Sequence, residues 1–280
     1  DKGKHLTVNR QKAQKFSEYI GEVPVVLLNP ADLNLSQGSP AQRRRFMDVL
    51  LSQSSKLYLH HLIQYNRSLK QRNRLLDSEL KDWQLIHSWE ENLVTHGTEV
   101  ILKRKETAEQ LSEMVSRFYQ ELSQEVDRVK IIYRSNVPFR TGEDVVEVYR
   151  QQFEQKRAQE TNYGATMVGP HRDDLLFLIN GTIMKDYASQ GEHKTFVIAL
   201  KLAEFRYLQQ QRSQSPILLF DDIFGELDSQ RIQSMLNQLS QIGQVFVTTT
   251  SRNFFDKVRD FDASTHYYFV EEGKIEAIEA

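Results

Sequence analysis

Two neighbouring carboxylates, Asp221 and Asp222, directly follow a short apolar run at residues 217–220. Such a run between turn residues predicts a buried strand, and helical patterns on both sides favour a parallel sheet. Ligands of open α/β sheets bind at the carboxyl ends of strands, where this pair lies. We expect Asp221 to hold Mg²⁺ through water and Asp222 to position a water that attacks a phosphate. The alternative is a buried strand that merely ends in two acids.

A small polar turn, Ser189-Gln190-Gly191, precedes a helical pattern. The backbone N–H groups of such a turn and the amino end of the helix favour an anion. Gly191 permits close approach of the backbone, and the Ser189 hydroxyl can donate to a phosphate oxygen. The pattern predicts an amphipathic helix whose apolar face carries Phe196, Ala199, Leu202 and Phe205. An ordinary Ser-Gly helix cap is the alternative.

A third element, the loop Gly-Glu-Leu-Asp at 225–228, opens the next helix. In this order the three elements resemble the signature, Walker B and D-loop elements of ABC-type ATPase heads. Two further runs, PADLNLSQGSPAQRRRFMD at 30–48 and GPHRDDL at 169–175, narrow the resemblance. The chain resembles the RecF family of bacterial DNA replication and repair proteins from about residue 5 to its end.

The resemblance implies an α/β fold, with a mostly parallel core sheet and a largely helical second lobe or short arm. Two such heads would sandwich two ATP molecules, with Mg²⁺ at Asp221 and a water positioned by Asp222. The γ-phosphate of the other protomer's ATP would meet the nucleotide-binding turn Ser189, Gln190 and Gly191, and Asp228 would link the two sites. The implied function is ATP-dependent binding to gapped or junction DNA with slow hydrolysis. In DNA repair, replication and the SOS response, this would help RecO and RecR load a recombinase.

Charge and composition limit the function classes. The 280 residues carry 36 Lys and Arg against 38 Asp and Glu, a formal charge of −2, so the chain as a whole is no polycation. The absence of cysteine excludes disulfides and thiolate metal sites. The histidines lack metal spacing in the sequence, and His60 and His61 are adjacent. No apolar run reaches eighteen residues, and we expect a cytoplasmic location.

Basic residues are concentrated between positions 39 and 74, where Asp48 is the single acid. We expect this stretch to bind DNA phosphates, with Arg43, Arg44 and Arg45 exposed on one helix. The candidate DNA-binding residues are Arg43, Arg44, Arg45, Arg67, Lys70, Arg72 and Arg74. A solvated basic face, or an internal partner for the acidic nucleotide site, is the alternative.

No G-x-x-x-x-G-K-[ST] P-loop occurs in the chain, which begins with Asp1 rather than Met. The resemblance places that loop ahead of residue 1, so we expect the sequence to be an amino-terminally truncated fragment that binds ATP poorly. Two alternatives remain open. One is a head of the SMC/Rad50 type, against which the short arm argues; the other is a non-enzymatic interaction module.

Three segments are expected: the end of ATPase lobe I and its crossing at 1–38, helical lobe II at 39–165, and the rest of the ATPase core at 166–280. Strands are predicted at 5–10, 23–28, 130–135 and 244–249, and a helix starts at Ser39-Pro40. Helices continue from 57 to about 129, with breaks near Asp77 and at Gly97. A hairpin with strands 175–179 and 182–187 turns at Asn180-Gly181, and another turns at Glu272-Gly273.

The run His171-Arg172-Asp173-Asp174 lies at the base of the first hairpin. Two interpretations are open: a salt-bridged structural corner, which we slightly favour, or a site specific to the family. The strand at 244–249 runs into Thr248, Thr249 and Thr250, where many ABC heads carry a histidine against the γ-phosphate.

Overall fold

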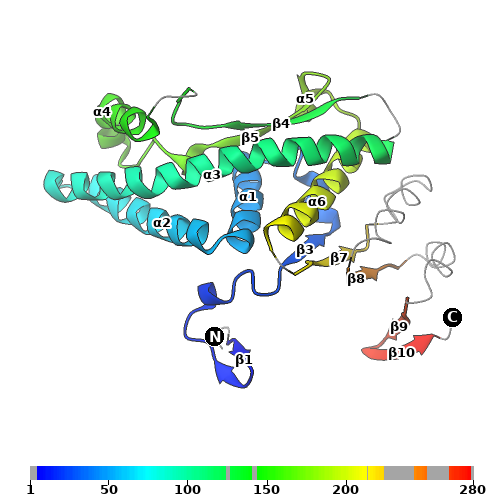
Figure 1. Ribbon diagram of the computed structural model, residues 1–280. Coiled ribbons are helices and arrows are strands. Elements are labelled where there is room, and N and C mark those ends of the chain that lie inside the picture. Colours follow the sequence, from blue (N-terminus) through cyan, green and yellow to red (C-terminus); the bar gives the residue numbers. More distant parts are fainter. Residues whose placement is uncertain are drawn as a thin grey trace.

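The computed structural model describes residues 5–123, 127–140, 144–212, 214–223, 243–250 and 265–278. The long helix α3 (Trp83–Ser123) crosses the molecule, with α2 (Lys56–Asp77) along one part of it and α6 (Gln190–Gln211) along the other (Figure 1). No helix in these ranges is both long and apolar enough to cross a membrane.

A parallel sheet carries the predicted carboxylates. Its strands are β3 (Val25–Leu28), β7 (Ile217–Asp221) and β8 (Val245–Thr248), in the order β3-β7-β8. In this register Leu28 lies beside Phe220 and Asp221 beside Thr248. The predicted α/β fold with a parallel sheet is therefore confirmed. Strand β8 appears at its predicted place but is not buried, because Phe246 and Val247 are 50% and 39% exposed.

Helix α6 packs against β3, α1 (Pro40–Ser54) and α3. The four residues of the predicted apolar face are all buried, but the helix is not amphipathic. Polar side chains on its other faces, including His193, Lys201 and Glu204, are buried as well. Helix α6 is buried on several faces because it has neighbours on several sides. The spacing of apolar residues in the sequence predicted only one buried face.

The helical region begins at the predicted cap, where the Ser39 backbone N–H donates to Gln42 Oε1 at 2.8 Å. Helix α2 ends at Asp77, as predicted. The predicted break at Gly97 is wrong, because this glycine lies inside α3. A Cβ there would lie 2.8 Å from the Tyr149 ring and 3.1 Å from the Tyr65 ring, so glycine allows these rings to pack close to the helix.

An antiparallel sheet lies on the side of α3 opposite to α2 and α6 (Figure 1). Its strands are β4 (Val129–Arg134), β5 (Asp174–Ile179) and β6 (Thr182–Ile183). Positive φ angles at Asn180 (50°) and Gly181 (83°) confirm the predicted turn. The return strand is shorter than predicted: it stops at Ile183, and α5 (Met184–Tyr187) follows with Met184 buried.

The remaining elements are short, apart from one helix. The prediction of a single strand at 5–10 is wrong. The backbone has positive φ angles at Asn9 and Arg10, so the chain turns there and forms a hairpin. The hairpin at Glu272-Gly273 is confirmed by positive φ angles at both residues. These elements are β1 (Thr7–Val8), β2 (Gln11–Lys12), η1 (Phe16–Glu18), η2 (Pro30–Asn34), α4 (Val145–Tyr163), η3 (Pro170–Arg172), β9 (Tyr267–Glu271) and β10 (Lys274–Ile278).

Two apolar cores share α3. The larger one joins its carboxyl-terminal half to α1, α6, β5 and β7. The smaller one joins Leu93, Val94 and Ile101 of its amino-terminal half to Tyr65 of α2 and Tyr149 of α4. The division into segments 1–38, 39–165 and 166–280 stays a prediction.

Candidate functional site

The carboxylates at the end of β7 are exposed and point to different partners. The Thr248 hydroxyl donates to Asp221 Oδ1 at 2.6 Å. The Thr250 N–H and hydroxyl lie 3.3 and 3.2 Å from Asp222 Oδ1. A left-handed backbone at Asp222, with φ of 50°, separates the directions of these neighbouring side chains. Both carboxylates are therefore oriented by threonines at the end of β8.

The side chains at this edge of the sheet supply few ligands for Mg²⁺. Within the described ranges, no group of three or more His, Asp or Glu side chains is arranged to hold a metal ion. Mg²⁺ commonly takes one or two carboxylates and fills its remaining positions with water and substrate phosphates. The exposed oxygens of Asp221 suit that role. The threonine partners were not predicted, because they become neighbours only through the pairing of β7 with β8.

The Ser189 turn forms a reciprocal helix cap on α6. The Ser189 N–H donates to Glu192 Oε2 at 2.5 Å, and the Glu192 N–H donates to Ser189 Oγ at 3.3 Å. Because Ser189 Oγ is an acceptor here, its own proton remains available to a further acceptor. Gln190 and Gly191 form the first turn of the helix. Both the cap and the predicted anion contact are compatible with this arrangement, and the anion contact stays a prediction.

Two polar contacts attach α6 to the segment that follows β3. His193 Nδ1 lies 2.9 Å from Ser36 Oγ, with both side chains buried. Lys201 Nζ lies 3.1 Å from Glu204 Oε2 and 3.8 Å from Asp32 Oδ1. Burial raises the pKa of Glu204, and Lys201 opposes that shift. Sequence reasoning missed these contacts, which join positions far apart in the chain.

The structure corrects two of the predicted DNA-binding residues. Arg43 is 7% exposed and pairs with Asp174. Arg72 is 1% exposed, and its Nη2 donates to Glu90 at 2.7 Å and to Glu160 at 2.5 Å. The expectation that Arg43 is exposed is therefore wrong. Arg72, a second candidate for DNA binding, is withdrawn from solvent by the same kind of pairing.

The other five candidate DNA-binding residues remain at the surface. Arg44 is partly exposed, and the remaining four are exposed; DNA binding by all five stays a prediction. We call this set the basic surface of α1 and α2: Arg44, Arg45, Arg67, Lys70 and Arg74.

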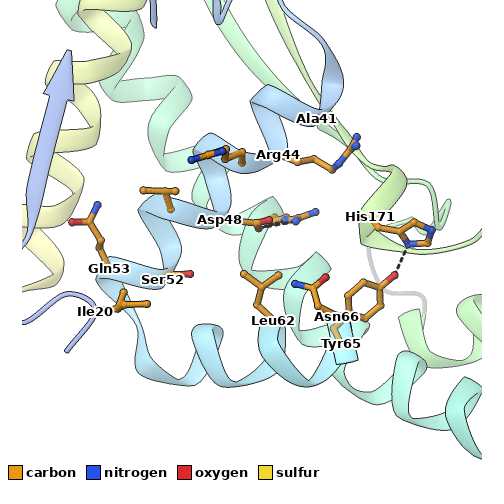
Figure 2. Close-up of a pocket in the computed structure, with 13 residues that line it drawn as sticks. Ile20, Ala41, Arg44, Asp48, Ser52, Gln53, Leu62, Tyr65, Asn66 and His171 are labelled. Carbon is orange, nitrogen blue, oxygen red and sulfur yellow. Dashed lines mark hydrogen bonds and ion pairs between the residues drawn. The ribbon is translucent and has the colours of Figure 1, made fainter. Parts of the chain in front are cut away.

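A cavity of about 620 Å³ opens between α1 and α2, beside Arg44 and Arg45. Figure 2 shows Arg44 and Asp48 on α1 facing Leu62, Asn66 and Tyr65 on α2, with His171 at the end of the cavity. One wall is formed by buried Arg104, whose Nη2 donates to Asp48 Oδ1 at 2.7 Å. The cavity therefore combines apolar side chains with cationic groups.

His171 is held as a neutral imidazole in this wall. Its Nε2 lies 3.0 Å from the Thr166 carbonyl and must donate to it, so Nδ1 accepts from the Tyr65 hydroxyl at 2.6 Å. Burial lowers the pKa of His171 to about 4; the hydrogen bond to Thr166 opposes this shift, and nearby Arg172 adds to it.

Asp173 is fully buried at the same corner. It accepts hydrogen bonds from the Tyr133 hydroxyl and the Asn136 N–H, and lies 3.6 Å from Arg104 Nη1. Burial raises the pKa of this carboxyl, whereas Arg104 opposes that shift. The structure thus supports a salt-bridged structural corner for the GPHRDD run. Asp228, the predicted D-loop residue, lies outside the described residues.

The chain has curated relatives and similar solved structures. No family model matches the chain. It is 37% identical over 266 residues to the DNA replication and repair protein RecF of Chloroherpeton thalassium, covering 92% of this chain and 72% of that protein. It is 38% identical over 276 residues to the RecF protein of Streptococcus suis, covering 98% and 75%.

Solved structures agree. A structure described as the recombination mediator protein RecF with ATP in the RecFOR pathway superposes with a TM-score of 0.86 and 28% identity. The match covers 99% of this chain and 73% of that one. A Smc head domain from Pyrococcus furiosus gives a TM-score of 0.50 with 14% identity, over 98% of this chain and 68% of that one, which shows the fold alone.

Proposed function

The chain belongs to the RecF family of DNA replication and repair proteins, and from this premise we propose that it acts in ATP-dependent DNA binding as a recombination mediator. The observation that carries the proposal is the carboxylate pair Asp221 and Asp222, which ends a strand of the parallel sheet and is oriented by Thr248 and Thr250. This edge of an open α/β sheet is where ligands bind.

At this edge the two carboxylates have separate roles. Asp221 would hold Mg²⁺ through water, and Asp222 would accept a proton from, or orient, the water that attacks the γ-phosphate. Mg²⁺, when bound, neutralises charge on the β- and γ-phosphates. Thr248 and Thr250 contact different carboxylates, so one would be free to hold the ion and the other to orient the water.

The signature turn acts on the nucleotide of a second copy of the chain. Ser189 and Gln190 are exposed, and the Ser189 hydroxyl proton is available to a γ-phosphate oxygen. The turn and the Asp221–Asp222 pair stand on different elements, and no hydrogen bond that the structure describes joins them. In this proposal, ATP bound between two heads would bring the turn of one copy to the carboxylate pair of the other, with Asp228 as the link between the two sites.

DNA binds along the basic surface of α1 and α2, and RecO and RecR are partners in recombinase loading in the cytoplasm. An SMC/Rad50-type head is less well supported, because the Smc match has 14% identity, whereas the RecF relatives are 37–38% identical over most of the chain. A purely structural interaction module would not need two oriented, exposed carboxylates at the edge of the sheet.

The test uses a longer protein that includes a P-loop lobe. Binding to gapped DNA is measured by fluorescence anisotropy with Mg-ATPγS, with Mg-ADP and without nucleotide. We expect ATPγS to tighten binding at least tenfold, and residues 1–280 alone to show no response to nucleotide. Equal DNA affinity of the longer protein in all three conditions would contradict the proposal.

A further inference from the structure

The cavity between α1 and α2 opens onto the basic surface of α1 and α2. Its volume of about 620 Å³ lies within the range of about 300–1,000 Å³ that is usual for sites of small organic molecules. Arg44 and Arg45 belong to the basic surface and also line the cavity. Asn66 of the lining directly precedes Arg67 of that surface. A DNA strand bound along the surface would therefore pass the mouth of the cavity.

Two cationic groups of the lining have N–H groups left for a ligand. Arg44 donates to the Asp173 carbonyl oxygen at 2.7 Å. In the ranges that the structure describes, Arg44 has no further hydrogen-bond partner, and Arg45 has no hydrogen-bond or ion-pair partner. Arg104 and Asp48 neutralise each other, with Nη2 2.7 Å from Oδ1. The charge that remains in the cavity for a ligand is therefore positive.

The surroundings of Arg44 favour an anion. Burial, and after it the nearby charge of Arg104, lower the pKa of Arg44, whereas the neighbouring carboxylates oppose the shift. A phosphate beside Arg44 would offset the repulsion between the two guanidinium groups. Hydrogen bonds between a guanidinium and phosphate oxygens are short and strong, because both partners are charged. The arginines of the cavity therefore suit a phosphate group.

The rest of the lining suits a nucleobase. Val49 is 48% exposed and Leu62 is partly exposed, so both present apolar surface to the cavity. Ser52 and Asn66 add a hydroxyl and an amide, which can pair with the donors and acceptors on the edge of a base. At the end of the cavity His171 is uncharged, with both ring nitrogens in hydrogen bonds (Figure 2). A nucleotide would use both parts of the cavity, whereas a bare phosphate would use only the arginines.

We propose that the cavity receives one nucleotide of single-stranded DNA, with its phosphate at Arg44 and Arg45 and its base against Val49 and Leu62. This inference rests on the proposed DNA binding and adds a site that distinguishes single strands from duplex. A base in a single strand is unpaired, so it enters the cavity without the cost of opening a base pair. In a duplex the bases stay paired and stacked, and only the phosphates contact the basic surface.

The test compares fluorescein-labelled oligo(dT) with an abasic strand of the same length, each titrated with the purified chain at low salt. Fluorescence anisotropy measures the two affinities. We expect oligo(dT) to bind at least fivefold more tightly, because the abasic strand keeps its phosphates but has no base to bury. Val49→Asn should reduce this preference at least threefold, since it removes apolar surface without changing charge. Arg44→Gln should weaken the binding of both strands.

The matched control is Ile63→Asn, because Ile63 is 44% exposed on α2 and lies outside the lining of the cavity. This variant should keep the full preference for oligo(dT). Equal binding of the two strands, no binding of either, or a preference that survives Val49→Asn would overturn the proposal. Tighter binding of a hexaglutamate peptide, abolished by Arg44→Gln, would overturn it too and identify a site for acidic peptides. A failure of ATPγS to tighten DNA binding would contradict the proposed function alone, since the strand comparison contains no ATP analogue.

Discussion

The guanidinium of Arg43 and the carboxylate of Asp174 form a two-point ion pair. Nε lies 2.8 Å from Oδ1 and Nη2 lies 3.0 Å from Oδ2, and both side chains are buried. The pair connects α1 to the first residue of β5, across 131 positions of sequence. An arginine that the sequence places in a basic, DNA-binding run is therefore part of the interior.

Arg43→Met should lower the free energy of unfolding by about 3 kcal/mol, because it removes the two-point partner of the buried Asp174 carboxylate and leaves it the longer contact with Arg134 Nη2 at 3.4 Å. The matched substitution Arg45→Met, at an exposed position two residues on, should change it by less than about 0.5 kcal/mol. Urea denaturation followed by circular dichroism measures both. Equal stability of the two variants would show that the Arg43 pair contributes nothing specific.

Charge reversal on the basic surface should weaken DNA binding in a P-loop-containing protein. Arg45→Glu and Arg67→Glu each remove one cation that binds a phosphate, so each should reduce the slope of log affinity against log salt by about 1. Arg117→Glu, an exposed arginine on α3 outside that surface, is the control. If the slope is unchanged in the surface variants as well as in the control, the basic surface is a solvated face that does not bind DNA phosphates.

Asp222→Asn should slow ATP hydrolysis by on the order of 10²-fold while ATP still binds, since the amide cannot accept the proton of the attacking water. Asp221→Asn should instead weaken Mg²⁺-dependent nucleotide binding. Both variants are made in a longer protein that includes a P-loop lobe, and turnover and nucleotide affinity are measured separately. If Asp222→Asn leaves turnover unchanged, another residue positions the attacking water.

Ser189→Arg should block ATP-dependent dimerisation while leaving nucleotide binding to the protomer's own site intact. The long side chain would occupy the space of the partner's γ-phosphate. Sedimentation with and without ATP measures this effect. Mixing the variant with a P-loop lysine mutant should restore at most one complete site per heterodimer. Dimerisation equal to that of the unmodified protein would exclude the two-copy arrangement.

The pKa of His171, lowered by burial to about 4 from an ordinary 6.5, predicts a loss of stability in acid. Between these values the unfolded chain binds a proton that the folded chain does not, so the free energy of unfolding falls as pH falls. The loss attributable to His171 is at most about 3.4 kcal/mol, at about 1.36 kcal/mol per pH unit over about 2.5 units. His171→Gln should flatten this part of the profile from pH 6.5 to 4. An identical slope in the variant would contradict a neutral, buried imidazole.

The sequence predicted local structure correctly where that structure depends on residues close together in the chain. The Ser39 cap, the Asn180-Gly181 turn and the apolar run before Asp221 each depend on a few consecutive residues, and each appears at its predicted place. The errors arose where distant residues decide. Gly97 looks like a helix break in sequence, but inside α3 it makes room for two tyrosine rings.

Tertiary structure alone decided the electrostatic role of each charged side chain. Sequence determined that arginines cluster before Arg74 and that two acids follow the apolar run of β7, because residue type and order are local properties. Whether a guanidinium meets water or a buried carboxylate depends on which helices pack around it, as the exposed Arg45 and the enclosed Arg43 demonstrate. Likewise, His61 and His96 become neighbours, with their Nδ1 atoms 3.0 Å apart, because α2 packs against α3 through apolar side chains such as Tyr65 and Leu93.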